Sequence, residues 1–244
     1  MNSLLNVEGL KGGYTHKNVL KGISFDVYPN EIVALIGLNG AGKSTTIKHI
    51  IGLMQEREGM IKLNQKEYRE DPEHYRKQFA YIPEMPLIYD ELTLYEHLKL
   101  TAMVYDLDEA TFDERLPFLL KAFRLEKQLN WFPSHFSKGM KQKVMILCAF
   151  LIDPSLYIVD EPFVGLDPLG IQAFLDHMVE KKEQGAGILM STHILATAER
   201  YCDRFLIMHD GLLRASGTLK ELQEEFNMPQ ATLDDIYIQL TKEA

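Results

Sequence analysis

A glycine-rich segment that ends in a lysine and two hydroxyl residues could bind phosphate. Residues Gly37–Thr45, Gly-Leu-Asn-Gly-Ala-Gly-Lys-Ser-Thr, satisfy the pattern G-x-x-x-x-G-K-[ST]. In this pattern the glycines let backbone N–H groups face the phosphates, the lysine reaches the terminal phosphates, and the first hydroxyl ligates Mg²⁺. The residues expected to touch a nucleotide are Gly37, Asn39, Gly40, Gly42, Lys43, Ser44 and Thr45. The alternative is a glycine-rich turn before an ordinary helix.

The residues on either side of this loop fit the geometry that phosphate binding needs. Ile32–Ile36 is a short apolar run, typical of a buried parallel strand. After the loop, apolar residues recur at helical spacing from Thr45 to Met54. The positive end of that helix would face the phosphates. Strand, glycine loop and helix together predict a nucleoside triphosphate site.

Two adjacent carboxylates follow a second apolar run. Leu156–Asp160 reads as a strand, and Asp160 at its end could hold Mg²⁺ opposite Ser44. Glu161 follows directly and is suited to act as a general base for the water that attacks the γ-phosphate. The alternative is a strand that ends in a solvated acidic turn. A guanine-specific Asn/Thr-Lys-x-Asp element does not occur in the chain, so the pair favours ATP hydrolysis.

The remaining patterns predict an α/β fold. Strands are expected at Ile23–Val27, Ile61–Leu63, Phe79–Ile82, Gly187–Ser191 and Phe205–Met208, in addition to the two strands above. Their alternation with helical segments indicates a mostly parallel sheet with crossover helices. The N-terminal part, which alternates apolar and polar residues, is expected to form an antiparallel β piece beside it.

A block of helices interrupts this alternation from about Pro86 onward. Thr93 and Glu96 form a capping-box pattern at the start of one helix. A second helix is expected over Thr111–Lys127, where Pro117 makes the first part irregular, and a third over Ser137–Ile152. Beyond the last strand, two short helices are expected between residues 218 and 240.

Composition limits the class of protein. The chain has 244 residues, 46% of them hydrophobic and 25% charged, as in ordinary soluble domains. Its net charge of −9 argues against wrapping nucleic acid. Cys148 and Cys202 show no metal-binding spacing and are expected to be free thiols in a reducing cytosol. The longest apolar run, Val144–Ile152, is far shorter than the ~20 residues of a membrane span, and no secretory signal is expected.

In their order along the chain, these segments resemble the nucleotide-binding subunit of an ABC transporter over essentially the whole length. The markers of the resemblance are Tyr14, Gly37–Thr45, a loop at Glu84, a signature at Phe136–Met140, Leu156–Glu161, Gly165–Asp167 and His193. The resemblance implies a P-loop NTPase core with a mostly parallel sheet, an N-terminal antiparallel β subdomain and an inserted helical subdomain. It implies one ABC ATPase domain over residues 1–244, with the core and β subdomain at 1–85 and 154–215, the helical subdomain at 86–153, and a helical tail at 216–244.

The resemblance also implies roles for residues outside the phosphate loop. Tyr14 would stack on the adenine, although alone it reads as a half-buried aromatic residue. Ser137, Lys138 and Gly139 would bind the γ-phosphate held by a second copy of the chain, although a serine before a helix is most often an N-cap. Asp167 would contact that second copy. His193 would sense the γ-phosphate, although a lone histidine at a strand end is usually structural.

The chain departs from the family pattern at Glu84 and within the signature. Glu84 stands where the family usually has a glutamine that contacts Mg²⁺ and water, so it adds negative charge beside the triphosphate. Lys138 replaces a glycine of the signature and would strain the backbone if that position required a positive φ. Met140 replaces a glutamine. These departures concern the rate of turnover more than the binding of nucleotide.

The function implied by the resemblance is the ATP-hydrolysing subunit of a membrane transporter. It would bind ATP and Mg²⁺, dimerise around two ATP molecules, and drive a separate transmembrane permease from the cytoplasmic face of the membrane. The cargo would be selected by the permease. One alternative is a soluble ABC protein that remodels a macromolecular complex, but such proteins usually carry two cassettes or long coiled coils. Another is a nucleotide-binding module that hardly turns over.

Overall fold

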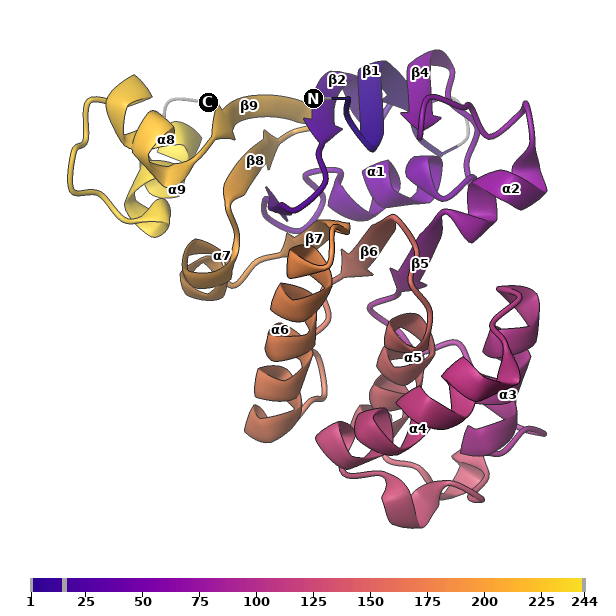
Figure 1. Ribbon diagram of the computed structural model, residues 1–244. Coiled ribbons are helices and arrows are strands. Elements are labelled where there is room, and N and C mark those ends of the chain that lie inside the picture. The colour runs from indigo at the N-terminus through magenta and orange to yellow at the C-terminus, as the bar shows by residue number, and fades with distance from the viewer. Residues whose placement is uncertain (1, 15–16, 243–244) are drawn as a thin grey trace.

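A six-stranded sheet forms the centre of the described part of the chain. The structure is a computed structural model, and it describes residues 2–14 and 17–242 (Figure 1). The sheet has the order β5-β6-β7-β3-β8-β9, made of β5 (Phe79–Ile82), β6 (Leu156–Asp160), β7 (Gly187–Thr192), β3 (Ile32–Ile36), β8 (Arg204–His209) and β9 (Leu212–Gly217). Neighbouring strands are parallel except β8 and β9, which are antiparallel. The predicted mostly parallel sheet is confirmed.

A smaller antiparallel sheet lies above one face of the larger one (Figure 1). It has the order β2-β1-β4, made of β2 (Leu20–Val27), β1 (Leu5–Gly12) and β4 (Glu58–Leu63). The helix α1 (Lys43–Ile50) packs between the two sheets, and its Ile47 and Ile50 are fully buried there. This is the predicted N-terminal antiparallel piece.

The strand β3 separates two hydrophobic cores, because successive side chains of a strand point to opposite faces. Val33 and Leu35 pack with α1 and the smaller sheet. Ile32, Ala34 and Ile36 pack with the helices on the other face. Every residue of β3 is buried, as expected for a parallel strand covered on both faces.

The remaining helices are distributed over the sheet edges and the second face. They are α2 (Pro72–Lys77), α3 (Leu94–Val104), α4 (Glu109–Phe123), α5 (Lys138–Leu151), α6 (Pro168–Glu183), α7 (Leu195–Tyr201), α8 (Leu219–Glu225) and α9 (Leu233–Lys242), with 3₁₀ turns at Glu126–Gln128 and Pro133–His135. The helices α3, α4 and α5 form a lobe below the carboxyl ends of β5 and β6 (Figure 1). We call this lobe, residues 94–151, the helical region.

Local signals set the ends of several helices. Thr93 accepts a hydrogen bond from the Glu96 N–H, and Glu96 reaches back to Thr93, so the predicted capping box at α3 is confirmed. The helix expected from Ser137 onward is α5, and Ser137 is its N-cap, which was the alternative to a phosphate-binding role for this serine. The expected helix over Thr111–Lys127 is instead α4, which starts after the Asp108 cap and stops where Arg124 adopts a φ of 59°. Pro117 lies inside α4 on its exposed side, where water can satisfy the carbonyl that loses its partner.

The helix after the phosphate loop is shorter than the sequence indicates. Apolar spacing extends to Met54, but α1 ends at Ile50, because Gly52 turns the chain with a φ of 75°. Cys148 and Cys202 are free thiols, as predicted, and burial raises the pKa of Cys148 to about 11. No helix in the described part of the chain has the length and apolar composition needed to cross a membrane.

Candidate active site

The phosphate-binding pattern lies between the end of β3 and the start of α1. Gly42 is the N-cap of α1 and has a φ of 112°, a conformation that favours glycine. Its carbonyl accepts a hydrogen bond from the Thr46 N–H at 2.8 Å, which starts the helix. The first N–H groups of α1 therefore face the loop without intrahelical partners, as phosphate binding requires.

Lys43 lies almost fully buried behind this loop. Its ammonium Nζ donates a hydrogen bond to the Gly37 carbonyl at 2.7 Å. The same Nζ is 3.5 Å from Oε1 of Glu161, and both side chains are about nine-tenths buried. One cation is thus held between a backbone carbonyl and a carboxylate, where it can reach the terminal phosphates of a bound nucleotide.

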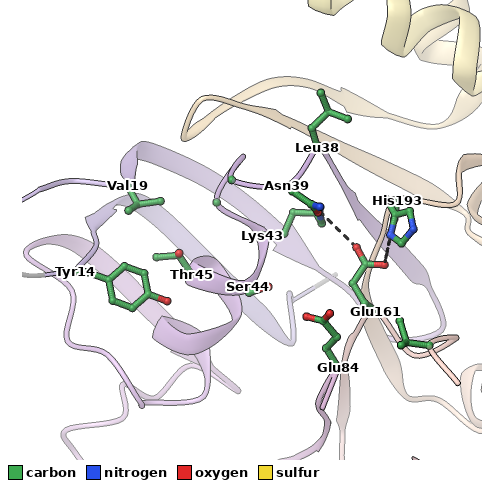
Figure 2. Close-up of a pocket in the computed structure, with 13 residues that line it drawn as sticks. Tyr14, Val19, Leu38, Asn39, Lys43, Ser44, Thr45, Glu84, Glu161 and His193 are labelled. Carbon is green, nitrogen blue, oxygen red and sulfur yellow. Dashed lines mark hydrogen bonds and ion pairs between the residues drawn. The ribbon is translucent and has the colours of Figure 1, made fainter. Parts of the chain in front are cut away.

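Glu161 lies at the turn after β6 in a strained backbone conformation. Its φ of 47° is unusual for a residue other than glycine. Its N–H donates to the Ser191 carbonyl at 3.1 Å, which fixes the turn against β7. Its Oε2 accepts hydrogen bonds from the His193 backbone N–H at 3.3 Å and from His193 Nδ1 at 2.7 Å. Figure 2 shows the carboxylate between Lys43 and His193.

Asp160 lies just behind Glu161 at the end of β6. Its Oδ1 accepts a hydrogen bond from Ser191 Oγ at 2.5 Å and one from Ser44 Oγ at 3.3 Å. Asp160 is 4% exposed. The parallel pairing of β6 with β7, and of β7 with β3, brings the ends of these strands to one edge of the sheet, where the hydroxyl and the carboxylate meet.

A cavity of about 390 Å³ opens in front of these groups (Figure 2). Of the predicted site residues it is lined by Tyr14, Asn39, Gly40, Gly42, Lys43, Ser44, Thr45, Glu84, Glu161 and His193. Gly37 and Asp160 lie behind the lining. Three apolar lining residues, Val19, Leu38 and Val164, were missed as site residues because a short apolar side chain in a loop carries no chemical signal in the sequence.

Tyr14 lies at the far end of the cavity from Glu161 (Figure 2). Its ring is half exposed, and Lys48 Nζ lies 5.3 Å from the ring centroid. Lys48 also donates a hydrogen bond to the Tyr14 hydroxyl at 2.9 Å, which lowers the pKa of that hydroxyl below its usual value. Beside Val19, the exposed ring offers a flat apolar surface on which a base could stack.

Glu84 enters the cavity from the loop after β5. Figure 2 shows its carboxylate on the side of Ser44 and Glu161. Burial, and then the charges of Asp160 and Glu84, raise the pKa of Tyr81 on β5. The carbonyl just before Glu84, on Pro83, accepts a hydrogen bond from Gln142 Nε2 of α5 at 3.0 Å. This link between the Glu84 loop and the signature helix was not predicted, because glutamine in a helix is usually a solvent-facing residue.

The signature residues lie outside the cavity of their own chain. Ser137 Oγ accepts the Met140 N–H at 3.2 Å and so acts as the N-cap of α5. Gly139 packs so closely on the Gly165 segment that a Cβ there would lie 2.1 Å from the Gly165 carbonyl oxygen. Lys138 lies in the first turn of α5, so the positive φ considered for this position is not required, and its side chain causes no backbone strain.

Asp167 is also outside the cavity, at the start of α6. It is the N-cap of that helix, and the Gly170 N–H donates to its Oδ1 at 2.6 Å. Lys143 of α5 lies 3.2 Å from its other oxygen. The Gly170 N–H, and then Lys143, hold the pKa of Asp167 below its usual value. Asp167 therefore stays charged near neutral pH and ties α6 to the signature helix.

Comparison with known proteins assigns the family. A family model described as ABC transporter matches residues 20–164. The chain belongs to the ABC transporter family. It is 66% identical over 241 residues to the ABC-type transporter ATP-binding protein EcsA of Bacillus subtilis, covering 99% of this chain and 98% of that protein. A solved ATP-binding subunit of an ABC transporter has a TM-score of 0.96 at 62% identity, covering 98% of this chain and 100% of its own.

A third match comes from a named transporter complex. The cbiO1 protein of Clostridium perfringens, described as part of the ABC transporter complex cbiONQ, has a TM-score of 0.77 at 28% identity and covers 93% of this chain and 92% of its own. The resemblance inferred from the motifs is confirmed, and so is the finer likeness to EcsA, which the segments Phe136–Lys143 and Ile82–Glu84 indicate in the sequence. This ABC subunit is an ATP-binding ATPase of a transporter.

Proposed function

We propose that two copies of this ABC subunit enclose two ATP molecules head to tail and drive a separate transmembrane permease. The observation that carries the proposal is that the signature residues lie apart from the cavity that holds the phosphate loop. The cavity gathers the phosphate loop, Glu161 and His193, whereas Ser137 and Gly139 of the signature lie outside it. If those two residues bind γ-phosphate, as the family resemblance implies, a second copy must supply them.

The oxygen ligands near Ser44 suit Mg²⁺. An octahedral Mg²⁺ with ligands at about 2.1 Å keeps neighbouring ligand oxygens about 3 Å apart. Ser44 Oγ and Asp160 Oδ1 are 3.3 Å apart. No group of three His, Cys, Asp or Glu side chains in the described ranges could hold a metal by itself, so phosphate oxygens and water would complete the shell. Ser44 and Asp160 would hold the ion, and Glu84 would approach it from the loop after β5. The ion would neutralise charge on the phosphates.

Each side chain of the site would then have a separate role in ATP hydrolysis. Lys43 would bind the β- and γ-phosphates in place of its contact with Glu161. Glu161 would accept a proton from the attacking water at its carboxylate, which His193 orients through the 2.7 Å bond to Oε2. His193 would also contact the γ-phosphate. Tyr14 would stack on the adenine. The extra carboxylate of Glu84 beside the triphosphate would slow turnover relative to glutamine.

Exposed apolar side chains in the helical region and in the segment just before it support a partner. Leu87, Tyr89, Trp131 and Phe132 are between 43% and 75% exposed. Leu87 follows the Glu84 loop directly, and the Leu94 N–H donates to the Trp131 carbonyl at 3.1 Å, which keeps these segments together. Because Leu87 adjoins the Glu84 loop, a movement of that loop would be transmitted to a permease bound here. We therefore propose a cytoplasmic protein held at the membrane by its permease, with the subdomain limits 1–85, 86–153, 154–215 and 216–244 and with no nucleic-acid partner.

The variant Glu161→Gln tests the catalytic and dimer parts together. It keeps the side-chain shape and removes the ability to take a proton. We expect ATP hydrolysis to slow by roughly 10²–10⁴-fold, which is about 3–5 kcal/mol of barrier. ATP should still bind, since Lys43, Ser44 and Asp160 are unchanged. Bound ATP would then hold the closed dimer by mass action. Size-exclusion chromatography with light scattering should give a dimer with ATP and a monomer with ADP.

The double variant Glu161→Gln, Ser137→Arg is the control for the dimer. The arginine would fill the γ-phosphate contact at the start of α5, so this protein should bind ATP and remain a monomer. Wild-type hydrolysis by Glu161→Gln alone would rule out the general-base role. A dimer that forms equally well with the Ser137→Arg change would rule out the signature contact, whatever the rate.

A further inference from the structure

The C-terminal helix α9 reaches the phosphate loop. α9 buries Leu233, Ile236, Tyr237 and Leu240, and it packs on α7 (Figure 1). The Leu38 N–H in the loop donates a hydrogen bond to the Tyr237 hydroxyl at 2.9 Å. Tyr237 is 8% exposed, whereas the Leu38 side chain is largely exposed. The contact therefore holds the loop by its backbone rather than by its side chain.

The peptide unit that Tyr237 holds is the same one that contacts Lys43. The Leu38 N–H and the Gly37 carbonyl belong to one planar peptide, so the direction of the first fixes the direction of the second. The Gly37 carbonyl accepts the hydrogen bond from Lys43 Nζ at 2.7 Å. On the other side, the Leu38 carbonyl accepts the Ala41 N–H at 3.0 Å. The entry to the loop is thus fixed at three points, one of which comes from α9.

A second contact joins α9 to the segment after His193. The Leu233 N–H, at the start of α9, donates to Oε2 of Glu199 at 2.7 Å. Glu199 lies in α7, the helix that follows His193. The C-terminal helix is therefore attached both to the phosphate loop and to the helix behind the predicted γ-phosphate sensor.

We propose that Tyr237 is a positioning residue of the ATP site. It does not line the cavity, so it would not touch nucleotide. Its hydroxyl fixes the Gly37–Leu38 peptide, so the loop is already shaped for phosphate before ATP binds, and less conformational freedom is lost on binding. The inference rests on the ATP binding of the family and is independent of the proposed dimer and permease.

The variant Tyr237→Phe tests this role, because it removes the hydroxyl and keeps the buried ring. Loss of one hydrogen bond to a neutral group corresponds to about a 3- to 10-fold effect. We expect ATP binding, measured with a fluorescent ATP analogue, to weaken by about that factor. Hydrogen exchange measured without nucleotide should become faster at the Leu38 amide.

Tyr157→Phe is the matched control. Its hydroxyl donates to the Ile152 carbonyl at 2.8 Å, and the residue is 1% exposed in the core, outside the cavity. It should lower the thermal midpoint about as much as Tyr237→Phe and leave ATP binding and Leu38 exchange unchanged. Wild-type exchange and affinity in Tyr237→Phe would overturn the proposal, as would an equal loss of affinity in both variants. If the wild type itself failed to bind ATP, the family function would fail, and the exchange rate would still decide the role of Tyr237.

Discussion

At the scale of single residues, the site holds the buried ammonium group of Lys43 between a backbone carbonyl and a carboxylate. Lys43 contacts the Gly37 carbonyl and lies 3.5 Å from Glu161, and Glu161 also accepts two hydrogen bonds from His193. The strained φ of Glu161 is maintained because the Ser191 carbonyl and His193 hold its backbone and side chain. A phosphate arriving in the cavity would compete with Glu161 for Lys43 and leave the carboxylate free to face water.

Removal of the lysine charge tests this arrangement. We expect Lys43→Ala to weaken ATP binding by roughly 10- to 100-fold, because hydrogen bonds to charged groups contribute about 1.5–3 kcal/mol. Isothermal titration calorimetry with ATP would measure the loss. Lys66→Ala is the matched control, since it removes the same charge from an exposed position away from the cavity. Wild-type affinity in Lys43→Ala would show that the phosphate loop is misassigned.

At the scale of elements, one aspartate joins the helical region to the nucleotide core. Asp153, between α5 and β6, lies 2.5 Å from Lys181 of α6 and also pairs with Arg115 of α4. Arg115 donates a further hydrogen bond to the Leu151 carbonyl at 2.8 Å. Burial raises the pKa of Asp153, but the ion pairs with Lys181 and Arg115 outweigh it and hold the pKa below its usual value.

The direction of this shift gives a pH-dependent stability. Because the pKa is lower in the folded state, the stabilisation is complete above the unfolded value of about 3.9 and is lost as the pH falls through the folded pKa. Asp153 is half exposed, so we expect Asp153→Asn to cost only about 0.5–1 kcal/mol at pH 7. The deficit should persist to about pH 4 and shrink below it, measured by urea unfolding at several pH values. Asp176→Asn, an exposed change on α6, should show no such pattern. A deficit that stays constant to pH 3 would contradict the ion-pair origin.

At the scale of the whole molecule, the exposed groups lie on different parts of the surface. Leu87, just after the Glu84 loop, and Trp131, in the helical region, are both exposed apolar residues. Phe118 is 73% exposed on the same helical region but borders a different pocket, with His177 of α6. Ser137, at the start of the signature helix, lines neither the pocket beside Phe118 nor the pocket formed by Asn130, Trp131, Phe132 and His135.

The double variant Leu87→Glu, Trp131→Glu tests the proposed permease contact and should detach the protein from the membrane. Charges at these positions would meet an apolar partner surface at a high desolvation cost. In the native cell, fractionation should move the protein from the membrane fraction to the soluble fraction, and ATP binding by the purified variant should be unchanged. Phe118→Glu should stay with the membrane. Equal release by Phe118→Glu would show that Leu87 and Trp131 are not the specific contact.

The sequence by itself determined the family, the phosphate loop and the acidic pair at the end of β6. These features are local, since each depends on residues a few positions apart: glycines before a lysine, apolar runs before a turn, and caps such as Thr93 and Ser137 at helix starts. The roles of Tyr14, Glu84 and Asp167 could be expected only through the resemblance. The strand β9 was not predicted, and the limits of α1 and α4 were wrong, because apolar spacing continues past the residues where Gly52 and Arg124 turn the backbone.

Only the tertiary structure decided which distant groups meet. Glu161 contacts Lys43 and His193 because the parallel strands that precede them end at one edge of the sheet. The order of the strands in the sheet cannot be read from the spacing of residues in the sequence. The bond from Leu38 to Tyr237 joins residues from opposite ends of the chain, and a tyrosine on an amphipathic helix reads as an ordinary core residue. Such contacts depend on how helices and sheets pack, which is a property of the folded chain as a whole and is not encoded in any short segment.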